Sequence, residues 1–206
     1  MNAKIEKRAG TQPLKVNGQT IGGYAAVFNS PADIGGHWIE VIAPGAFSET
    51  LRSGGDVLAL YSHELERLLG RRSSGTLRVV EDAKGLAVEI DLPDTSDGRD
   101  VAVLVERGDL KGMSFGFVVT HDEWDETQEP PRRTIHAVDL REVTVTATPA
   151  YEDTELGMRS LQRAREDSPR DRDQAQRNAK LAQARIAERK AKMDQTFRGI
   201  RPASRD

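Results

Sequence analysis

Cysteine is absent from this chain of 206 residues, which excludes disulfides, cysteine nucleophiles and metal sites built from thiolates. Aromatic residues are scarce at 5%, and no stretch of about 18 apolar residues occurs that would cross a membrane. The first 18 residues contain no apolar run of signal-peptide length. We therefore expect a soluble protein that is not secreted by a standard signal and that has no membrane partner.

Sequence signatures of bound cofactors are lacking too. The four histidines, His37, His63, His121 and His136, show none of the short pairwise spacings that metal ligands adopt. No glycine-rich phosphate loop ending in Gly-Lys-Ser or Gly-Lys-Thr occurs. We expect neither a metal nor a cofactor.

Charge is distributed unevenly, although the formal net charge is only −3. Residues 159–206 hold 14 Lys and Arg against 7 Asp and Glu, whereas the rest of the chain holds 16 against 26. The C-terminal part also has few large apolar residues, which predicts a basic tail that is partly helical or disordered. We therefore divide the chain into a flexible N-terminal segment over 1–18, a folded domain over 19–158 and the tail over 159–206. A nucleic-acid partner is not expected, because the basic residues of the tail are not interleaved with aromatic ones.

Most of the body has the pattern of β-strands, with β-branched and aromatic residues bounded by Gly and Pro. The polar run over 123–133 is expected to be a loop. About seven strands with two short helices indicate a mainly β (α+β) fold, either a closed or nearly closed barrel or a sandwich. The strands are expected over residues 21–28, 38–42, 57–62, 76–80, 86–92, 113–120 and 141–148.

Two short helices are expected between these strands. The first opens after Pro44, with Phe47 and Leu51 on one face, and ends at a Gly-Gly pair. The second covers residues 97–107, with an apolar stripe along it and a capping residue near Thr95.

Ser114 lies in a strand pattern whose alternation puts it on the face opposite Met113, Phe115 and Phe117. Gly116 shares the face of the serine, and a small residue there leaves room for a substrate to approach. Taken alone, the pattern fits an exposed strand serine as well as a nucleophile.

Two further residues have the chemistry that a nucleophilic serine needs. His63 follows an apolar strand, and it could be either a general base or a surface histidine. Glu142 lies within a strand pattern, where a carboxylate has low propensity but is well suited to orient an imidazole. Composition and spacing do not assemble these residues into one site.

Five short blocks occur in a characteristic order: GGYAAVF at 22–28, IAPGAF at 42–47, YSH at 61–63, GMSFGF at 112–117 and LREVTVTATPAY at 140–151. Their order and spacing resemble the prohead protease family of tailed bacteriophages, which is similar in fold to the herpesvirus assemblins. The resemblance implies an assemblin-like β-barrel of about seven strands with a few short helices, so that residues 19–158 form a serine protease domain.

The resemblance also implies roles for particular residues. Ser114 matches the nucleophile of the family, and His63 matches its catalytic histidine. Glu142 matches the position of the third, acidic member, where assemblins have a second histidine. Asp139 is the alternative for this third role, because the strand register cannot be fixed from the sequence.

The donors of the oxyanion hole are not identified by the resemblance. Arg71 and Arg72 are candidates for that neighbourhood, although they fit equally well as exposed arginines of a loop.

The function implied is that of an endopeptidase that cleaves the scaffold or the delta region of the major capsid protein, and also itself. It would act in the host cytoplasm, inside the assembling prohead, and the basic tail is a candidate for recruitment and for removal by self-cleavage. Assemblins are active as dimers, which raises a homodimer as an open expectation. The alternatives are an inactive scaffold or assembly protein with the same fold, or a fused protease and scaffold.

Overall fold

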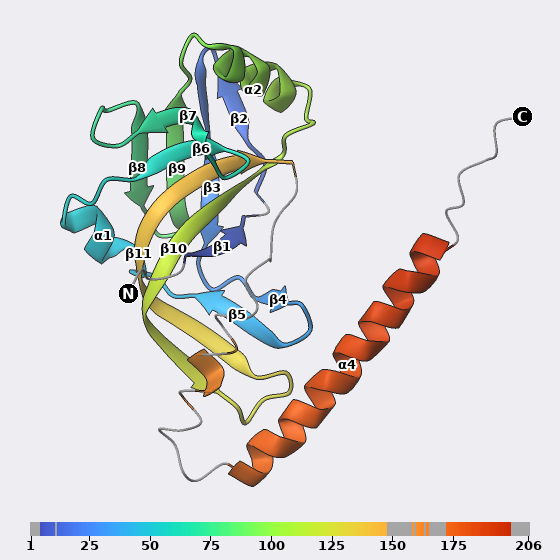
Figure 1. Cartoon of the computed structure of the whole chain (residues 1–206). Helices are drawn as coiled ribbons and strands as arrows, with labels where there is room; N and C mark the ends of the chain where they lie inside the picture. The colour runs from blue at the N-terminus through green and yellow to red at the C-terminus, as the bar shows by residue number, and fades with distance from the viewer. Residues whose placement is uncertain are drawn as a thin grey trace, which may run out of the picture.

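The computed structural model describes residues 5–10, 12–147, 158, 160–162, 164 and 172–198. Within them, eleven strands and three labelled helices follow one another along the chain (Figure 1). The strands are β1 (Glu6–Ala9), β2 (Lys15–Asn17), β3 (Thr20–Val27), β4 (Ala32–Ile34), β5 (Trp38–Ile42), β6 (Leu58–Tyr61), β7 (Glu64–Arg71), β8 (Leu77–Glu81), β9 (Gly85–Asp91), β10 (Gly112–Asp125) and β11 (Arg132–Thr146); the helices are α1 (Ser48–Arg52), α2 (Ser96–Glu106) and α4 (Arg172–Arg198).

The strands form two sheets. The larger sheet has seven strands in the order β1-β10-β11-β5-β4, with β6 pairing with another part of β11 and β7 pairing with β6. The smaller sheet has four strands in the order β2-β3-β9-β8. The expectation of a mainly β protein with few helices is confirmed. A seven-stranded barrel is not what forms, because the pairings of the described strands do not close into a ring and the strands number eleven.

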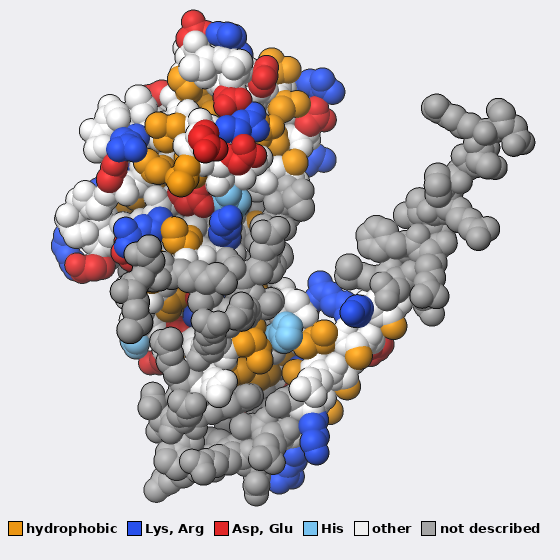
Figure 2. Space-filling model, in the orientation of Figure 1, with side chains coloured by type: hydrophobic (Ala, Val, Ile, Leu, Met, Phe, Trp, Pro, Cys, Tyr) orange, Lys and Arg blue, Asp and Glu red, His pale blue; other side chains and the backbone are white. Residues whose placement is uncertain are grey.

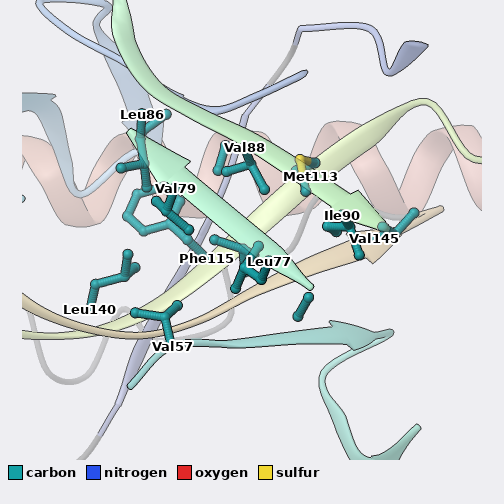
Figure 3. Packing of buried hydrophobic residues seen from close by; sticks show 14 of the residues in the cluster. Val57, Leu77, Val79, Leu86, Val88, Ile90, Met113, Phe115, Leu140 and Val145 are labelled. Carbon is teal, nitrogen blue, oxygen red and sulfur yellow. The ribbon is translucent and has the colours of Figure 1, made fainter. Parts of the chain in front are cut away.

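One hydrophobic core lies between the two sheets. Figure 3 shows side chains of β10 and β11 in the same cluster as side chains of β8 and β9. Strand alternation explains this arrangement, since each sheet turns one apolar face towards the other. Members of the cluster include Met113, Phe115, Leu140 and Val145 from the larger sheet and Leu77, Val79, Leu86, Val88 and Ile90 from the smaller one.

The hairpin of β10 and β11 carries most of the larger sheet. Its strands are 14 and 15 residues long, and they extend into the run 123–133 that the sequence led us to expect as a loop. The ladder shifts register between Gly116 and Phe117, because Gly116 faces Glu142 whereas Phe117 faces Leu140. Such irregularities increase local twist and redirect neighbouring side chains, and they are common beside active sites.

The two expected helices are confirmed. α1 follows Phe47, which is completely buried. α2 is capped by Thr95, whose hydroxyl oxygen accepts a hydrogen bond from the backbone N–H of Gly98 at 3.2 Å. α2 lies within one residue of its expected bounds, and α1 begins about three residues later than expected.

The N-terminal segment differs from the expectation of a flexible arm over 1–18. Its described residues hold β1 and β2, and β1 pairs antiparallel with β10 at the edge of the larger sheet. β1 was missed because its sequence, Glu-Lys-Arg-Ala, has none of the apolar alternation that marks a strand.

Glu6 and Arg8 of β1 are buried with three partners from other strands, Glu40, Asp122 and Arg133. These five residues are called the anchor cluster below. Arg8 and Arg133 each contact both Glu6 and Glu40, and Arg133 also contacts Asp122 at 2.7 Å. The burial of charge on β1 therefore depends on residues far away in the sequence.

Part of the expected tail is described. α4 lies within residues 159–206, and Figure 2 shows Lys and Arg side chains along it. Arg189 of α4 pairs with Asp33 at 3.0 Å, and Ile186 lies near Gly36. The expectations for residues 148–151, for the boundary at 158–159 and for the end of the tail lie wholly or partly outside the described residues. Among the residues that are described, no helix combines the length and the hydrophobicity needed to cross a membrane.

Candidate active site

His63 lies in a two-residue turn between β6 and β7. Both turn residues have positive φ, 55° for Ser62 and 63° for His63, and Tyr61 and Glu64 are paired on either side. Turns of this shape favour Asn and Gly, since other residues pay a steric cost of about 1 kcal/mol or more in the left-handed region. The turn is therefore held by contacts from outside the hairpin.

Thr144 of β11 supplies two of those contacts. Its hydroxyl oxygen accepts a hydrogen bond from the backbone N–H of His63 at 2.9 Å and donates one to the carbonyl oxygen of Leu60 at 2.9 Å. The backbone N–H of Ser62 also donates to the carbonyl of Val145 at 3.0 Å. Because Thr144 is completely buried, its hydroxyl group fixes the position of the turn that carries the imidazole.

The imidazole of His63 contacts the carboxylate of Glu142. The Nδ1 and Oε1 atoms are 2.6 Å apart, and both side chains are about nine-tenths buried. A carboxylate at Nδ1 favours the tautomer in which Nδ1 carries the proton and Nε2 presents a lone pair. Within the described part of the chain, the buried Nε2 atom has no hydrogen-bond partner, so it is available to accept a proton.

Ser114 lies on β10 directly opposite Thr144. Residues opposite each other in an antiparallel pair point to the same face of the sheet, and so do residues two positions apart. Ser114, Gly116, Glu142 and Thr144 therefore share one face. This face lies opposite the core-facing side chains of Met113 and its neighbours, as the alternation predicted.

The absence of a side chain at Gly116 has a different structural reason from the expected one, which was room for a substrate. A Cβ atom on Gly116 would lie 2.6 Å from Oε1 and 2.7 Å from Cγ of Glu142. The space above the glycine is filled by the carboxylate, so Gly116 makes room for Glu142 rather than for a substrate. The sequence could have indicated this only if the register of β10 against β11 had been known.

The hydroxyl group of Ser114 has a partner in the structure. It is completely buried and donates a hydrogen bond to the backbone carbonyl of Arg8, at 2.7 Å. Arg8 belongs to β1, and its neighbour Ala9 is the residue paired with Ser114. Sequence reasoning missed this contact because β1 itself was missed.

The other candidate residues lie elsewhere. The carboxylate of Asp139 pairs with the guanidinium of Arg141 at 2.5 Å on an exposed part of β11. Arg71 pairs with Asp56 at 3.1 Å, and Arg72 donates to the carbonyls of Leu51 and Gly55. Both arginines thus hold the loop at the far end of the β6–β7 hairpin from His63.

Serine hydrolases combine a serine with a histidine–carboxylate pair, and the register places Ser114 on the same sheet face as Glu142, which contacts His63. No three His, Cys, Asp or Glu side chains of the described residues are grouped so as to hold a metal ion. The class of protein that this geometry suggests is a hydrolase with a serine nucleophile.

Comparison with known proteins gives the family. Residues 4–167 match the family model of the caudovirus prohead serine protease, and the chain belongs to that family. The match begins before β1 and extends beyond the range of the five sequence blocks. It therefore includes the N-terminal strand that sequence reasoning had left out of the domain.

Two known proteins are similar to this chain, one in sequence and one in fold. The prohead protease of Enterobacteria phage HK97 is 34% identical over 134 residues, which are 63% of this chain and 55% of the HK97 protein. The chain thus spans about half the length of this curated relative. The structure of the bacteriophage T4 capsid assembly protease covers 72% of this chain and 100% of its own, with a TM-score of 0.50 and 9% sequence identity. At that identity the likeness concerns the fold alone.

Proposed function

We propose that this chain is a serine endopeptidase of prohead maturation, with Ser114 as nucleophile, His63 as general base and Glu142 as the residue that orients the base. The observation that carries the proposal is the contact of His63 Nδ1 with Glu142 Oε1 at 2.6 Å, on the sheet face that Ser114 shares. Membership of the prohead serine protease family supports the same reaction. The exposed pairing of Asp139 with Arg141 favours Glu142 over Asp139 as the third residue.

The reaction begins when His63 Nε2 accepts the proton of Ser114 Oγ as the oxygen attacks the carbonyl carbon of the scissile peptide bond. The C–N bond then breaks, and the imidazolium gives its proton to the leaving amine. Water, activated by the same Nε2 atom, hydrolyses the acyl-enzyme and regenerates the serine. Throughout, the carboxylate of Glu142 accepts the Nδ1–H hydrogen bond and stabilises the positive charge on the ring.

Burial of the histidine–carboxylate pair supports this assignment. In a partly dehydrated site the attraction between imidazolium and carboxylate is stronger than in water. Thr144 keeps the ring in place through the backbone of His63, which limits the reorganisation needed during the reaction.

The substrate that we propose is the major capsid protein, cleaved in its scaffold or delta region, or a separate scaffold protein. The T4 structure is that of a capsid assembly protease, and a protease of this kind would act inside the prohead in the host cytoplasm. We further propose that the chain cleaves itself and that the basic residues 159–206 are a segment removed in this way. A homodimer is the oligomeric state to test first.

Co-expression of the protease with the major capsid protein of the same phage tests the proposal. Wild type should convert the capsid protein to a shorter form, whereas Ser114→Ala should leave it at full length. Ser74→Ala, at an exposed loop position, is the matched control and should process normally. Processing that is unchanged in Ser114→Ala would instead favour the inactive scaffold or assembly protein.

A further inference from the structure

The edge of the larger sheet next to the proposed nucleophile is occupied by β1. β1 is the outermost strand on that side, and beyond β10 it has no other strand partner among the described residues. Its pairing places Lys7 opposite Gly116 and Ala9 opposite Ser114. The backbone N–H of Gly10 continues the ladder by donating to the carbonyl of Met113 at 2.7 Å. Four residues of this chain therefore lie where an extended peptide could pair with β10.

The hydrogen bond from Ser114 to β1 is incompatible with catalysis. Ser114 Oγ donates its proton to the carbonyl oxygen of Arg8, whereas the reaction requires that proton to go to His63 Nε2. The Nε2 atom is buried and has no partner among the described residues. Since Ser114 is itself fully buried, a substrate carbonyl has no access to Oγ while β1 is in place.

The side chain of Arg8 holds β1 in this position. Its guanidinium donates to both oxygens of Glu40, at 2.5 and 3.0 Å, and to Glu6 at 2.8 Å. Burial alone would raise the pKa of Glu40, but the charges of Arg8 and Arg133 and the hydrogen bonds from Arg8 and Trp38 lower it, so the carboxylate stays ionised. A fixed, buried ion pair of this kind gives β1 a defined register on β10.

The residues of the anchor cluster outside β1 also remain paired with one another when β1 is displaced. β1 contributes one negative charge, Glu6, and one positive charge, Arg8. Without them, Glu40 keeps Arg133 at 3.1 Å and the indole N–H of Trp38 at 3.3 Å. Arg133 in turn keeps Asp122 at 2.7 Å. Because the remaining groups still pair with one another, removal of β1 leaves no isolated buried charge.

We propose that β1 occupies the substrate site, and that an extended segment of the substrate protein binds by adding to the edge of β10 in its place. Strand addition to a sheet edge is a general mode of peptide recognition, in which main-chain hydrogen bonds supply affinity. In this arrangement β1 acts as an intramolecular inhibitor, and the protease is latent until β1 is displaced. The inference rests on the proposed function, because it takes Ser114 as the nucleophile.

The rate at which a fluorophosphonate reacts with Ser114 in the full-length protein tests the proposal. Arg8→Met removes the guanidinium but keeps the length of the side chain, and Glu6 and Glu40 retain Arg133 as a partner. We expect labelling of Ser114 to be about tenfold faster or more in Arg8→Met, because the fraction of molecules with an open site rises. Arg78→Met is the matched control: it makes the same substitution in ion pairs with Glu89 and Asp91 on the smaller sheet, and it should label like wild type.

A second measurement does not depend on how the variant folds. In wild-type protein that carries the phosphonate on Ser114, the amide of Gly10 should exchange hydrogen faster than in unmodified protein, because β1 is displaced. Equal labelling rates in wild type and Arg8→Met, or unchanged protection of Gly10 after labelling, would overturn the inference. If no variant is labelled at Ser114 and none processes the capsid protein, it is the proposed function that fails.

Discussion

Two buried polar clusters each include a residue of β10, and they differ in how completely their side-chain atoms are paired. The anchor cluster joins Glu6, Arg8, Glu40, Asp122 and Arg133 through five ion pairs, and none of its side-chain atoms is buried without a partner. The second group, His63, Ser114, Glu142 and Thr144, contains the proposed catalytic residues and is called the catalytic cluster. It holds two buried atoms without partners among the described residues, His63 Nε2 and Glu142 Oε2.

This difference in pairing distinguishes a cluster with a structural role from a cluster that is suited to catalysis. A buried polar atom without a partner costs free energy, so native proteins keep few of them. The anchor cluster contains more charge but leaves no atom unpaired, which is what a structural cluster requires. The catalytic cluster keeps an unpaired proton acceptor, His63 Nε2, and the hydroxyl group of Ser114 is the partner that the proposed mechanism gives it.

The largest effect on the catalytic cluster is expected from Glu142→Gln. The amide keeps the shape but can favour the wrong tautomer of His63, and the corresponding change in a serine protease lowers kcat by about 10⁴. Processing of the capsid protein should fall to that extent, while the free energy of unfolding changes little. Asp139→Asn is the control, and an equal loss of activity there would contradict the assignment of Glu142.

The largest effect on the anchor cluster is expected from Arg133→Met. Glu6 and Glu40 would then keep only Arg8 as a cation within the cluster, and Asp122 would lose its ion pair there. Breaking a buried ion pair in this way costs about 3–5 kcal/mol. Denaturant unfolding should report that loss, and well below the Tm the processing rate should not fall. Arg141→Met, in an exposed pair, should cost less than about 1 kcal/mol. Loss of activity without loss of stability in Arg133→Met would assign the cluster to catalysis.

Thr144→Val is expected to have a smaller effect, which lowers both the free energy of unfolding and kcat. The change leaves the partly buried N–H of His63 and the buried carbonyl of Leu60 without their partner, which costs about 1–3 kcal/mol. As a positioning residue, Thr144 should affect kcat more than KM, and Thr144→Ser should restore most of the rate. Equal kcat in the Val and Ser variants would show that the hydroxyl group does not position His63.

The smallest effect on stability is expected at an exposed ion pair of the smaller sheet, between Arg78 and Asp91. Hydrogen bonds from Arg78 and Thr20 lower the pKa of Asp91 to about 2. A carboxyl group whose pKa is lower in the folded protein than in the unfolded chain stabilises the fold at pH values above the unfolded pKa. This stabilisation is lost as the pH falls towards the folded pKa. Because both side chains are more than four-tenths exposed, Asp91→Asn should cost less than about 1 kcal/mol at neutral pH and nothing below about pH 2. Urea unfolding at the two pH values measures this.

The sequence predicted the parts of the fold that local patterns determine. The strands β3, β5, β6, β8 and β9 and the helices α1 and α2 lie close to their expected positions, because alternation, capping and glycine turns act over a few residues. Ser114 was correctly placed on the face opposite Met113 by the same alternation. The position of His63 directly after β6 followed from the apolar run before it.

What could not be predicted depends on contacts between distant residues. β1 is a strand only because β10 pairs with it and because Arg8 meets Glu40, 32 positions away. The need for glycine at 116 depends on a register that brings Glu142 opposite it. The prediction of a seven-stranded barrel was wrong for a related reason. The packing of the whole molecule determines which strands pair with each end of β11.

Peptide mapping after prolonged reaction with a fluorophosphonate tests the central claim most directly, because the reagent marks an activated serine. We expect a single phosphonate on Ser114, no adduct in His63→Ala, and slower labelling in Glu142→Gln. A phosphonate on another serine, or labelling of Ser114 that continues at the wild-type rate in His63→Ala, would contradict it.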